Sequence, residues 1–153
     1  MISTVECVFW RYDLKEKLVV FLCGLIGSGK TTYALSHFRN FTDLDYMNNY
    51  ARKQDQINWT KRLLEKNAEV CHITTYPSTK EIEAFADVRQ EFVLIDTDIN
   101  QCKTNILIRN RMRDMQNITN VFKANIRYKE LFQASDLPFT KINLFIKSEK
   151  ERS

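Results

Sequence analysis

The sequence predicts an α/β protein with a parallel five-stranded sheet and helices on both of its faces. Apolar runs with the length of buried strands alternate with longer stretches that have helical periodicity. The first apolar run leads into a glycine-rich turn and then a helix, as in proteins built from strand-turn-helix units. The chain has 153 residues, an apolar fraction of 44% and a charged fraction of 27%, which are values of one globular domain. We therefore expect a single domain over residues 1–153.

Residues 18–23 are the predicted first strand, and the segment after them carries the most specific motif of the chain. This segment reads G-L-I-G-S-G-K-T-T and matches the phosphate-binding pattern G-x-x-x-x-G-K-[ST], the Walker A motif or P-loop. All three glycines of the chain lie in it, so glycine occurs only where the backbone must approach something closely. Ala34, Leu35 and Phe38 then share one face of the predicted following helix.

The P-loop motif gives most of its positions a chemical role. Backbone N–H groups of the loop, with the positive end of the next helix, are expected to face phosphate oxygens. Lys30 should reach the β- and γ-phosphates, and the Thr31 hydroxyl should ligate Mg²⁺. ATP and Mg²⁺ are thus the expected cofactors. The expected nucleotide-binding residues are Gly24, Gly27, Ser28, Gly29, Lys30, Thr31 and Thr32.

The rest of the chain continues the alternation of strands and helices. The other predicted strands cover residues 41–45, 69–75, 91–96 and 141–146. The other predicted helices cover residues 46–67, 79–89, 99–112 and 118–134. The second of these begins at the capping box Ser78-Thr79-Lys80-Glu81. Residues 1–17 form an N-terminal extension, which is compatible with an extra strand or with a short helix.

Two carboxylates follow the predicted second strand and are candidates for handling a phosphoryl acceptor. Asp43 or Asp45 could accept the proton of a hydroxyl or orient it for in-line attack on the γ-phosphate. We favour Asp45, because the prediction places it nearer the tip of the strand. The competing interpretation is that these aspartates only cap the next helix.

An arginine-rich segment lies between the last two predicted helices. Arg109, Arg111 and Arg113 stand at alternate positions, which is too many arginines for one helical face. Arginines on a mobile segment can stabilise the charge that develops in phosphoryl transfer, so we predict a lid over residues 109–117. The alternative is a solvated basic helix end, favoured by the helix dipole.

A third acidic position favours a different function. The apolar run before Asp96 has the appearance of a Walker B strand, whose acid helps to hold Mg²⁺. An acid at the end of a buried strand is common, so this signal is weak. If Asp96 has this role, the protein would be an ATPase that couples hydrolysis to a protein or nucleic-acid partner.

Composition sets broad limits on location and partners. No apolar run has the roughly 18 residues that span a bilayer, so we expect no membrane partner and a cytoplasmic protein. The net charge of +4 is a mild bias toward acidic ligands. Four cysteines, at positions 7, 23, 71 and 102, lack metal-ligand spacing and are expected to be reduced thiols.

The order of motifs resembles that of small P-loop kinases of the polynucleotide kinase and nucleoside or nucleotide kinase type. The resemblance covers roughly residues 18–146. It rests on the P-loop, the D-L-D-Y that follows the next strand, the strand-helix-strand over 70–96, D-T-D-I-N-Q-C-K-T-N-I and R-N-R-M-R. The chain departs from the pattern of these kinases in two ways. Its third predicted strand ends in I-T-T-Y-P, where many of them carry a metal-binding aspartate, and it lacks the D-R-S or E-R-S motif of the deoxynucleoside kinases.

The resemblance implies roles for the residues already singled out. They are Lys30 as the phosphate lysine, Thr31 as the Mg²⁺ ligand, Asp43 or Asp45 as the acceptor carboxylate, and Arg109, Arg111 or Arg113 as lid arginines. The implied function is a kinase that transfers the γ-phosphoryl group of ATP to a nucleotide, a nucleoside or a 5′-hydroxyl nucleic-acid end. The ATPase, and a P-loop protein that binds nucleotide without turnover, remain alternatives, and the oligomeric state stays open.

Overall fold

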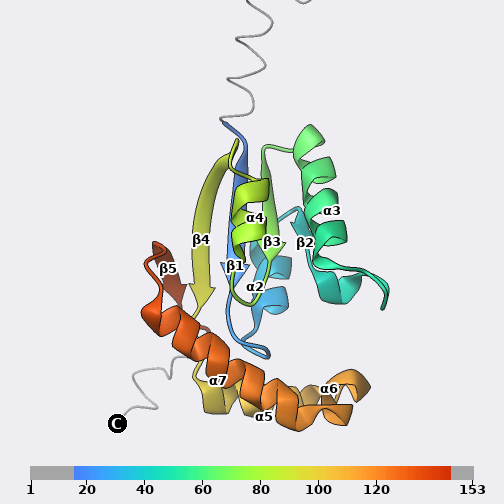
Figure 1. Ribbon diagram of the computed structural model, residues 1–153, viewed down its shortest axis with the longest axis vertical. Helices are drawn as coiled ribbons and strands as arrows, with labels where there is room; N and C mark the ends of the chain where they lie inside the picture. The colour runs from blue at the N-terminus through green and yellow to red at the C-terminus, as the bar shows by residue number, and fades with distance from the viewer. Residues whose placement is uncertain (1–15, 146–153) are drawn as a thin grey trace, which may run out of the picture.

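The computed structural model describes residues 16–145, and these contain one parallel five-stranded sheet with helices on both faces (Figure 1). The strand order is β2-β3-β1-β4-β5, and every neighbouring pair is parallel. The strands are β1 (Leu18–Cys23), β2 (Phe41–Thr42), β3 (Glu69–Ile73), β4 (Arg89–Ile95) and β5 (Phe139–Ile142). The predicted α/β class is confirmed, and most of the predicted N-terminal extension lies outside the described residues.

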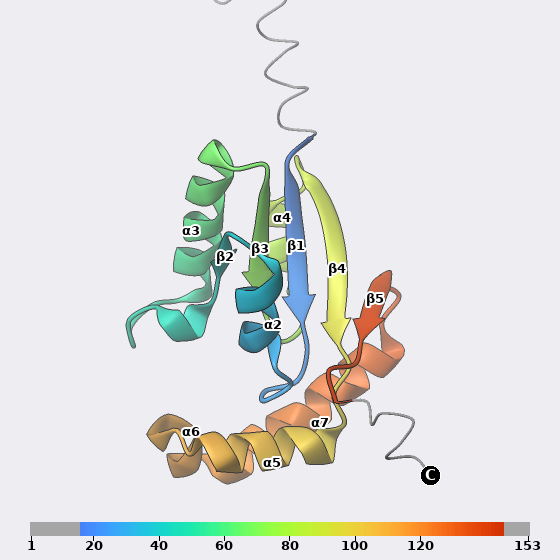
Figure 2. The same cartoon turned by 180° about the vertical axis from the view of Figure 1, so that it is seen from behind.

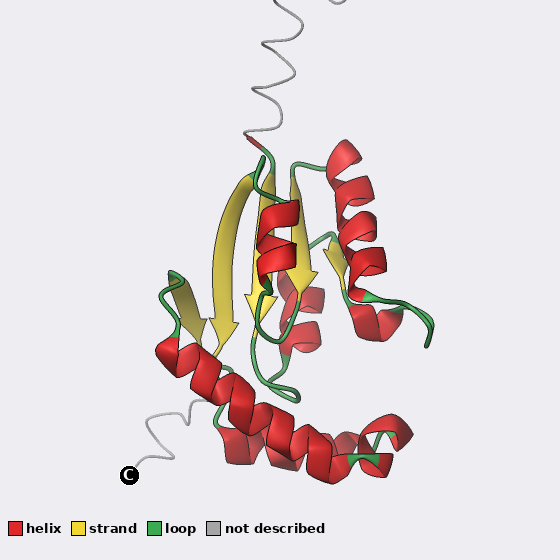
Figure 3. Ribbon diagram, viewed as in Figure 1, coloured by secondary structure: helices red, strands yellow, loops and turns green. Residues whose placement is uncertain are grey.

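Helices follow each of the first four strands, and three successive helices separate β4 from β5 (Figure 3). They are α2 (Lys30–His37), the 3₁₀-helix η1 (Leu44–Tyr46), α3 (Lys53–Lys66), α4 (Thr79–Ala84), α5 (Ile99–Arg109), α6 (Met112–Gln116) and α7 (Ile118–Ala134). The last of them has the predicted bounds. None of the helices in residues 16–145 is long and apolar enough to cross a membrane.

The central strand β1 is buried along its whole length and separates two apolar layers. On one face, Phe21 packs with Ile57 of α3 and with Phe85, which follows α4. On the other face, Leu22 packs with Ala34 of α2. The two views therefore show α4 and α2 on opposite sides of the sheet (Figures 1 and 2). Cys23, Cys71 and Cys102 are buried free thiols, and Cys7 lies outside the described residues.

The second strand is shorter than predicted, and the helix after it begins later. Strand β2 ends at Thr42, because the Asp43 side chain accepts a hydrogen bond from the Asp45 amide and starts η1. Helix α3 begins at Lys53 instead of residue 46. At this start the Asp55 carboxylate accepts a hydrogen bond from the Arg52 amide. The prediction of a strand over 41–45 and of a helix from 46 is thus wrong at both boundaries.

Other predicted boundaries also differ from the structure. The capping box at Ser78 is present, but α4 ends at Ala84 because hydrogen-bonded turns occupy the chain up to Val88. Strand β3 ends at Ile73, two residues early, and β5 covers Phe139–Ile142 in place of 141–146. The arginine-rich segment is largely helical, with only a turn at Asn110 between α5 and α6.

Helices α5, α6 and α7 cross below the carboxyl edge of the sheet, where the P-loop lies (Figure 1). The contact is close at Gly27, where an added Cβ atom would lie 2.7 Å from the Cys102 carbonyl oxygen and 2.8 Å from the Ile106 side chain. The three helices therefore form one arm against the P-loop, and we call residues 99–134 the helical arm.

Candidate phosphate-binding site

The P-loop has a backbone conformation that requires glycine. Gly27 has φ 81° and Gly29 has φ 101°, both in the left-handed region that side chains other than glycine rarely adopt. At Gly27 a side chain would also collide with α5, as described above. Gly29 is the N-cap of α2, so the chain turns there and presents the first amides of the helix to the space inside the loop.

Lys30 lies across the mouth of the loop. Its Nζ donates hydrogen bonds to the carbonyl oxygens of Gly24 and Leu25, each at 2.8 Å. Burial of the ammonium group lowers the pKa of Lys30 to about 8. The negative charges that nearby groups carry when deprotonated, those of Cys23 and Asp43 first among them, oppose this shift. An anion in the loop would offer this ammonium a stronger partner than two neutral carbonyl groups.

A buried hydroxyl inside the loop is also without a partner. Ser28 is fully buried, and its Oγ is the one buried side-chain polar atom in residues 16–145 with no hydrogen bond. Such groups are uncommon in native proteins because the lost hydrogen bond to water is not replaced. Together with the free amides and the Lys30 ammonium, this hydroxyl fits a site that binds phosphate.

Thr31 and Asp43 come together beside the loop. The Thr31 hydroxyl donates to Asp43 Oδ2 at 2.8 Å, and Asp43 is only 5% exposed. A hydroxyl and a carboxylate are oxygen ligands of the kind that Mg²⁺ binds, with water and phosphate oxygens completing its octahedron. Within residues 16–145 no group of three or more His, Cys, Asp or Glu side chains is placed to hold a metal ion.

The Asp45 side chain has different partners from that of Asp43 and pairs with the helical arm. It belongs to η1, is exposed, and pairs with Arg113 at 3.1 Å and Arg111 at 3.5 Å. The expectation that Asp45 is nearer the tip of the strand is therefore wrong, since Asp43 is the residue that directly follows β2. The carboxylate beside the predicted metal ligand is that of Asp43.

The three predicted lid arginines divide into two groups. Arg109 donates from both Nε and Nη2 to the largely buried Asp114, which fastens the end of α5 to α6. Arg111 and Arg113 reach across to Asp45 on η1, as described above. The arm thus spans the space between the P-loop and the residues that follow β2.

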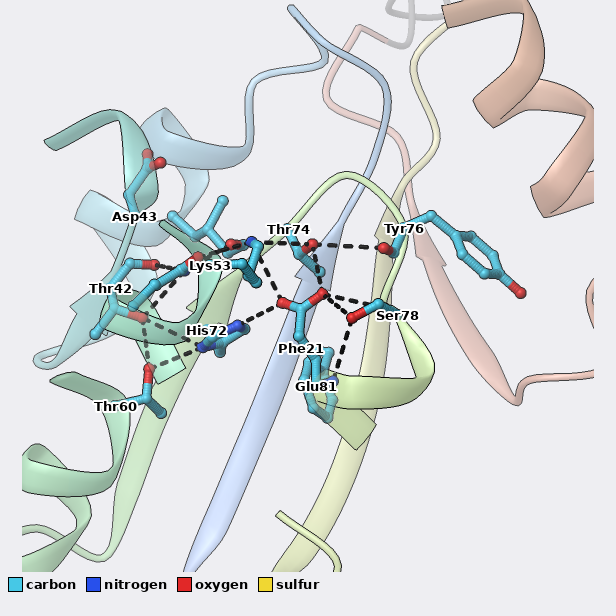
Figure 4. Close-up of polar contacts among 12 residues, drawn as sticks. Phe21, Thr42, Asp43, Lys53, Thr60, His72, Thr74, Tyr76, Ser78 and Glu81 are labelled. Atoms are coloured by element: carbon cyan, nitrogen blue, oxygen red, sulfur yellow. Dashed lines mark hydrogen bonds and ion pairs between the residues drawn. The ribbon is translucent and has the colours of Figure 1, made fainter. Parts of the chain in front are cut away.

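A buried polar network lies behind this space, between β3, α3 and α4. Figure 4 shows the Glu81 carboxylate between the His72 ring and Ser78, with Lys53 reaching it from α3. Glu81 Oε2 lies 2.6 Å from His72 Nε2 and 3.3 Å from Lys53 Nζ. Burial lowers the pKa of His72, so the ring is neutral and donates one hydrogen bond to Glu81 while accepting another from Thr60 at 2.8 Å.

Replacing Glu81 by glutamine tests how much this network stabilises the fold. Burial alone would raise the pKa of Glu81, but the hydrogen bond from His72 and the charge of Lys53 outweigh it and lower the pKa to about 2. Ionised Glu81 therefore stabilises the fold above pH 4.5, and this stabilisation is lost as pH falls from 4.5 toward 2. We expect Glu81→Gln to lower the free energy of unfolding at pH 7 by about 2–3 kcal/mol, because it removes the charged partner of His72 and Lys53. The expected loss is below that of a fully buried ion pair because Lys53 is partly exposed.

Denaturant unfolding of this variant at pH 7 and pH 3 measures the effect. The difference from the unchanged protein should shrink strongly at pH 3, where Glu81 loses much of its charge advantage. Glu83→Gln, on the exposed side of the same helix, is the matched control and should change stability by less than about 0.5 kcal/mol. An equal effect of the two substitutions would contradict the role of the network.

The other acid singled out in the sequence, Asp96, follows β4. Its side chain is exposed, and its amide donates to the Ile142 carbonyl at 2.7 Å. With Leu25 and Phe132 it lines a small cavity of about 180 Å³. No contact in residues 16–145 links its carboxylate to Lys30 or Thr31. Its role as a Walker B acid stays a prediction.

Side chains from distant parts of the chain donate hydrogen bonds to the P-loop backbone, and none of them was predicted from the sequence. They are Thr97, Asn105 and Asn125, and we call them the P-loop clamp. Their partners lie 69 to 99 residues away in the sequence, and no local pattern marks them.

A further apolar pair, Leu144 and Phe145, follows β5 and lies exposed beside Gly29.

Comparison with known proteins identifies the fold. The structure is similar to a deoxyadenosine kinase from M. mycoides solved with dCMP and dCDP, with a TM-score of 0.55 and 13% identity over 84% of this chain and 91% of the other. The same enzyme with bound dATP gives a TM-score of 0.50 and 12% identity over 84% and 92%.

A sugar kinase from Janibacter sp. gives a TM-score of 0.52 and 15% identity over 89% of this chain and 91% of the other. No protein-family model matches the chain, and no curated protein sequence matches it. At these identities the likeness shows the fold, which is the α/β P-loop NTPase fold that the sequence predicted.

Proposed function

We propose that this protein is a kinase that transfers the γ-phosphoryl group of ATP to a nucleotide, a nucleoside or a 5′-hydroxyl nucleic-acid end. The observation that carries the proposal is the contact between Thr31 and Asp43 beside Lys30. It brings a hydroxyl ligand for Mg²⁺ and a buried carboxylate to the phosphate loop, although they come from different elements. The carboxylate would orient the acceptor hydroxyl, and Lys30 would bind the transferred phosphate.

Two further observations support a transferase over an ATPase. Arg111 and Arg113 approach the P-loop side of the molecule from the helical arm and pair with Asp45, which suits a lid over residues 109–117. The solved structures with the same fold include a deoxyadenosine kinase and a sugar kinase. Mg²⁺, when bound with ATP, would neutralise charge on the β- and γ-phosphates.

Transfer of labelled γ-phosphate tests the proposal. The protein is incubated with ATP and Mg²⁺ and with nucleosides, nucleoside monophosphates, or 5′-hydroxyl DNA and RNA oligonucleotides as separate acceptors. Label in one acceptor class would establish a kinase and name its substrate. Label released only as inorganic phosphate would favour the ATPase, and bound ATP without any turnover would favour a nucleotide-binding role.

The lowered pKa of Lys30 predicts how nucleotide binding depends on pH. Below pH 8 the ammonium is charged before and after binding, so its contribution to ATP affinity should be constant. Above pH 8 the neutral amine must take up a proton on binding, and affinity should fall toward tenfold per pH unit. Calorimetry at pH 8 in two buffers of different ionisation enthalpy should show uptake of about half a proton per nucleotide.

Lys30→Arg is the control for this dependence, because a guanidinium stays charged over the whole range. Its affinity, whatever its value at pH 7, should not fall between pH 8 and pH 9.5 from this cause. A decline of the same slope in both proteins would assign the pH dependence to another group.

A further inference from the structure

Three successive carbonyl groups of the P-loop each accept a hydrogen bond from a clamp side chain. The pairs are Ile26 with Asn125 at 2.9 Å, Gly27 with Asn105 at 2.9 Å, and Ser28 with Thr97 at 2.7 Å. The donors come from three elements: Thr97 follows β4, Asn105 lies on α5 and Asn125 on α7. Thr97 is 5% exposed and Asn125 1% exposed, so these two side chains are shielded from water, while Asn105 is partly buried.

These contacts fix the direction of the peptide groups. All peptide bonds of the described residues are trans, so each carbonyl points away from the N–H group of the next residue. Holding three carbonyls outward turns the amides of the following residues toward the inside of the loop. The Ser28 amide donates to the Leu25 carbonyl at 3.1 Å, whereas the amides of Gly27 and Gly29 find no acceptor within residues 16–145.

Asn125 has a contact that makes its amide group specific. Its Oδ1 accepts from the Ile26 amide at 2.8 Å, while its Nδ2 donates to the Ile26 carbonyl. A carboxylate of the same size could accept but not donate, and it would repel the carbonyl oxygen. Both backbone groups of Ile26 are therefore fixed by one side chain of the helical arm.

We propose that Thr97, Asn105 and Asn125 are positioning residues that hold the P-loop in the conformation that binds a phosphate chain. This inference rests on the proposed function in one respect, namely that the loop binds the phosphates of a nucleotide. The clamp side chains bond to backbone groups of the loop and would not themselves bind the phosphates. The clamp acts by keeping free amides directed into the loop, so that little ordering is required when the phosphates bind. Its loss should weaken binding of the phosphate chain and leave the acceptor site unaffected.

Substitutions at Thr97 give the most direct test, because valine removes the hydroxyl at almost constant shape and serine keeps it. Calorimetry measures the affinity of each variant for inorganic tripolyphosphate and for ATP, both with Mg²⁺. We expect Thr97→Val to bind both ligands about tenfold more weakly and Thr97→Ser to bind them within about twofold. Thr104→Val, which removes a hydroxyl bonded only to the Asn100 carbonyl on α5, is the matched control and should not change affinity.

A second pair of variants extends the test to α7. Asn125→Asp keeps the acceptor for the Ile26 amide and loses the donor, and we expect at least a tenfold loss of tripolyphosphate affinity. Asn120→Asp, at an exposed position of the same helix, adds the same charge without contacting the loop. Thermal unfolding without ligand identifies any variant that has lost its fold at the assay temperature.

The outcomes separate this inference from the proposed function. If the unchanged protein does not bind tripolyphosphate or ATP, or if Lys30→Ala binds them equally well, the proposed function fails. If binding depends on Lys30 but Thr97→Val binds as tightly as Thr97→Ser, the clamp inference fails alone. It also fails if the Thr97→Val substitution raises the KM for the acceptor as much as the KM for ATP, since a general loss of structure would do this.

Discussion

Replacing Lys30 by alanine is expected to lower the rate of phosphoryl transfer by about 1,000-fold. The Lys30 ammonium lies across the mouth of the P-loop, held at 2.8 Å from the carbonyl oxygens of Gly24 and Leu25. These carbonyls are weaker partners than the phosphate oxygens on which negative charge builds up during transfer. A single-turnover measurement with saturating ATP and the acceptor identified in the labelling experiment gives the rate.

The fold should survive this substitution. Alanine removes a charge whose burial already lowers the pKa of Lys30, so the loss of favourable contacts is offset by the loss of an unfavourable buried charge. We expect the midpoint of thermal unfolding without ligand to change by only a few degrees. Unchanged transfer by Lys30→Ala would overturn the phosphate-binding role of the loop and with it the kinase proposal.

Local sequence signals predicted a large part of this fold. The P-loop is specified by its own residues, because positive φ angles at Gly27 and Gly29 restrict these positions to glycine. The capping box between Ser78 and Glu81 and the long periodic helix 118–134 are also encoded within one or a few helical turns. Boundaries were wrong where a side chain starts a new element, as Asp43 does for η1.

The candidate site was harder to predict because its contacts join distant residues. Asp43 and Thr31 are 12 residues apart, and Asn125 and Ile26 are 99 apart. Which of the two asparagines of α7, Asn120 or Asn125, faces the P-loop depends on how the helical arm crosses the sheet edge. Glu81 shows the same limit, since its capping role was visible in sequence but its pairing with His72 and Lys53 was not.

Replacing Asp43 by asparagine is expected to lower the rate of phosphoryl transfer about 100- to 1,000-fold with little change in ATP affinity. The same substitution at Asp45 is expected to have a much smaller effect on this rate. Asp43 is 5% exposed and its Oδ2 accepts from the Thr31 hydroxyl at 2.8 Å, so its carboxylate lies beside the predicted Mg²⁺ ligand. Asparagine keeps the shape but cannot take a proton from an acceptor hydroxyl.

Asp45 differs from Asp43 in both exposure and partners. Its side chain and those of Arg111 and Arg113 are each at least 40% exposed, and such ion pairs contribute little to stability in water. Asp45→Asn should therefore release the helical arm without removing a reacting group, with a loss of transfer below about tenfold. A larger loss for Asp45→Asn than for Asp43→Asn would mean that Arg111 and Arg113 leave Asp45 when substrates bind, and that η1 then supplies the acceptor carboxylate. Rates of both variants at saturating ATP and acceptor decide between these two arrangements.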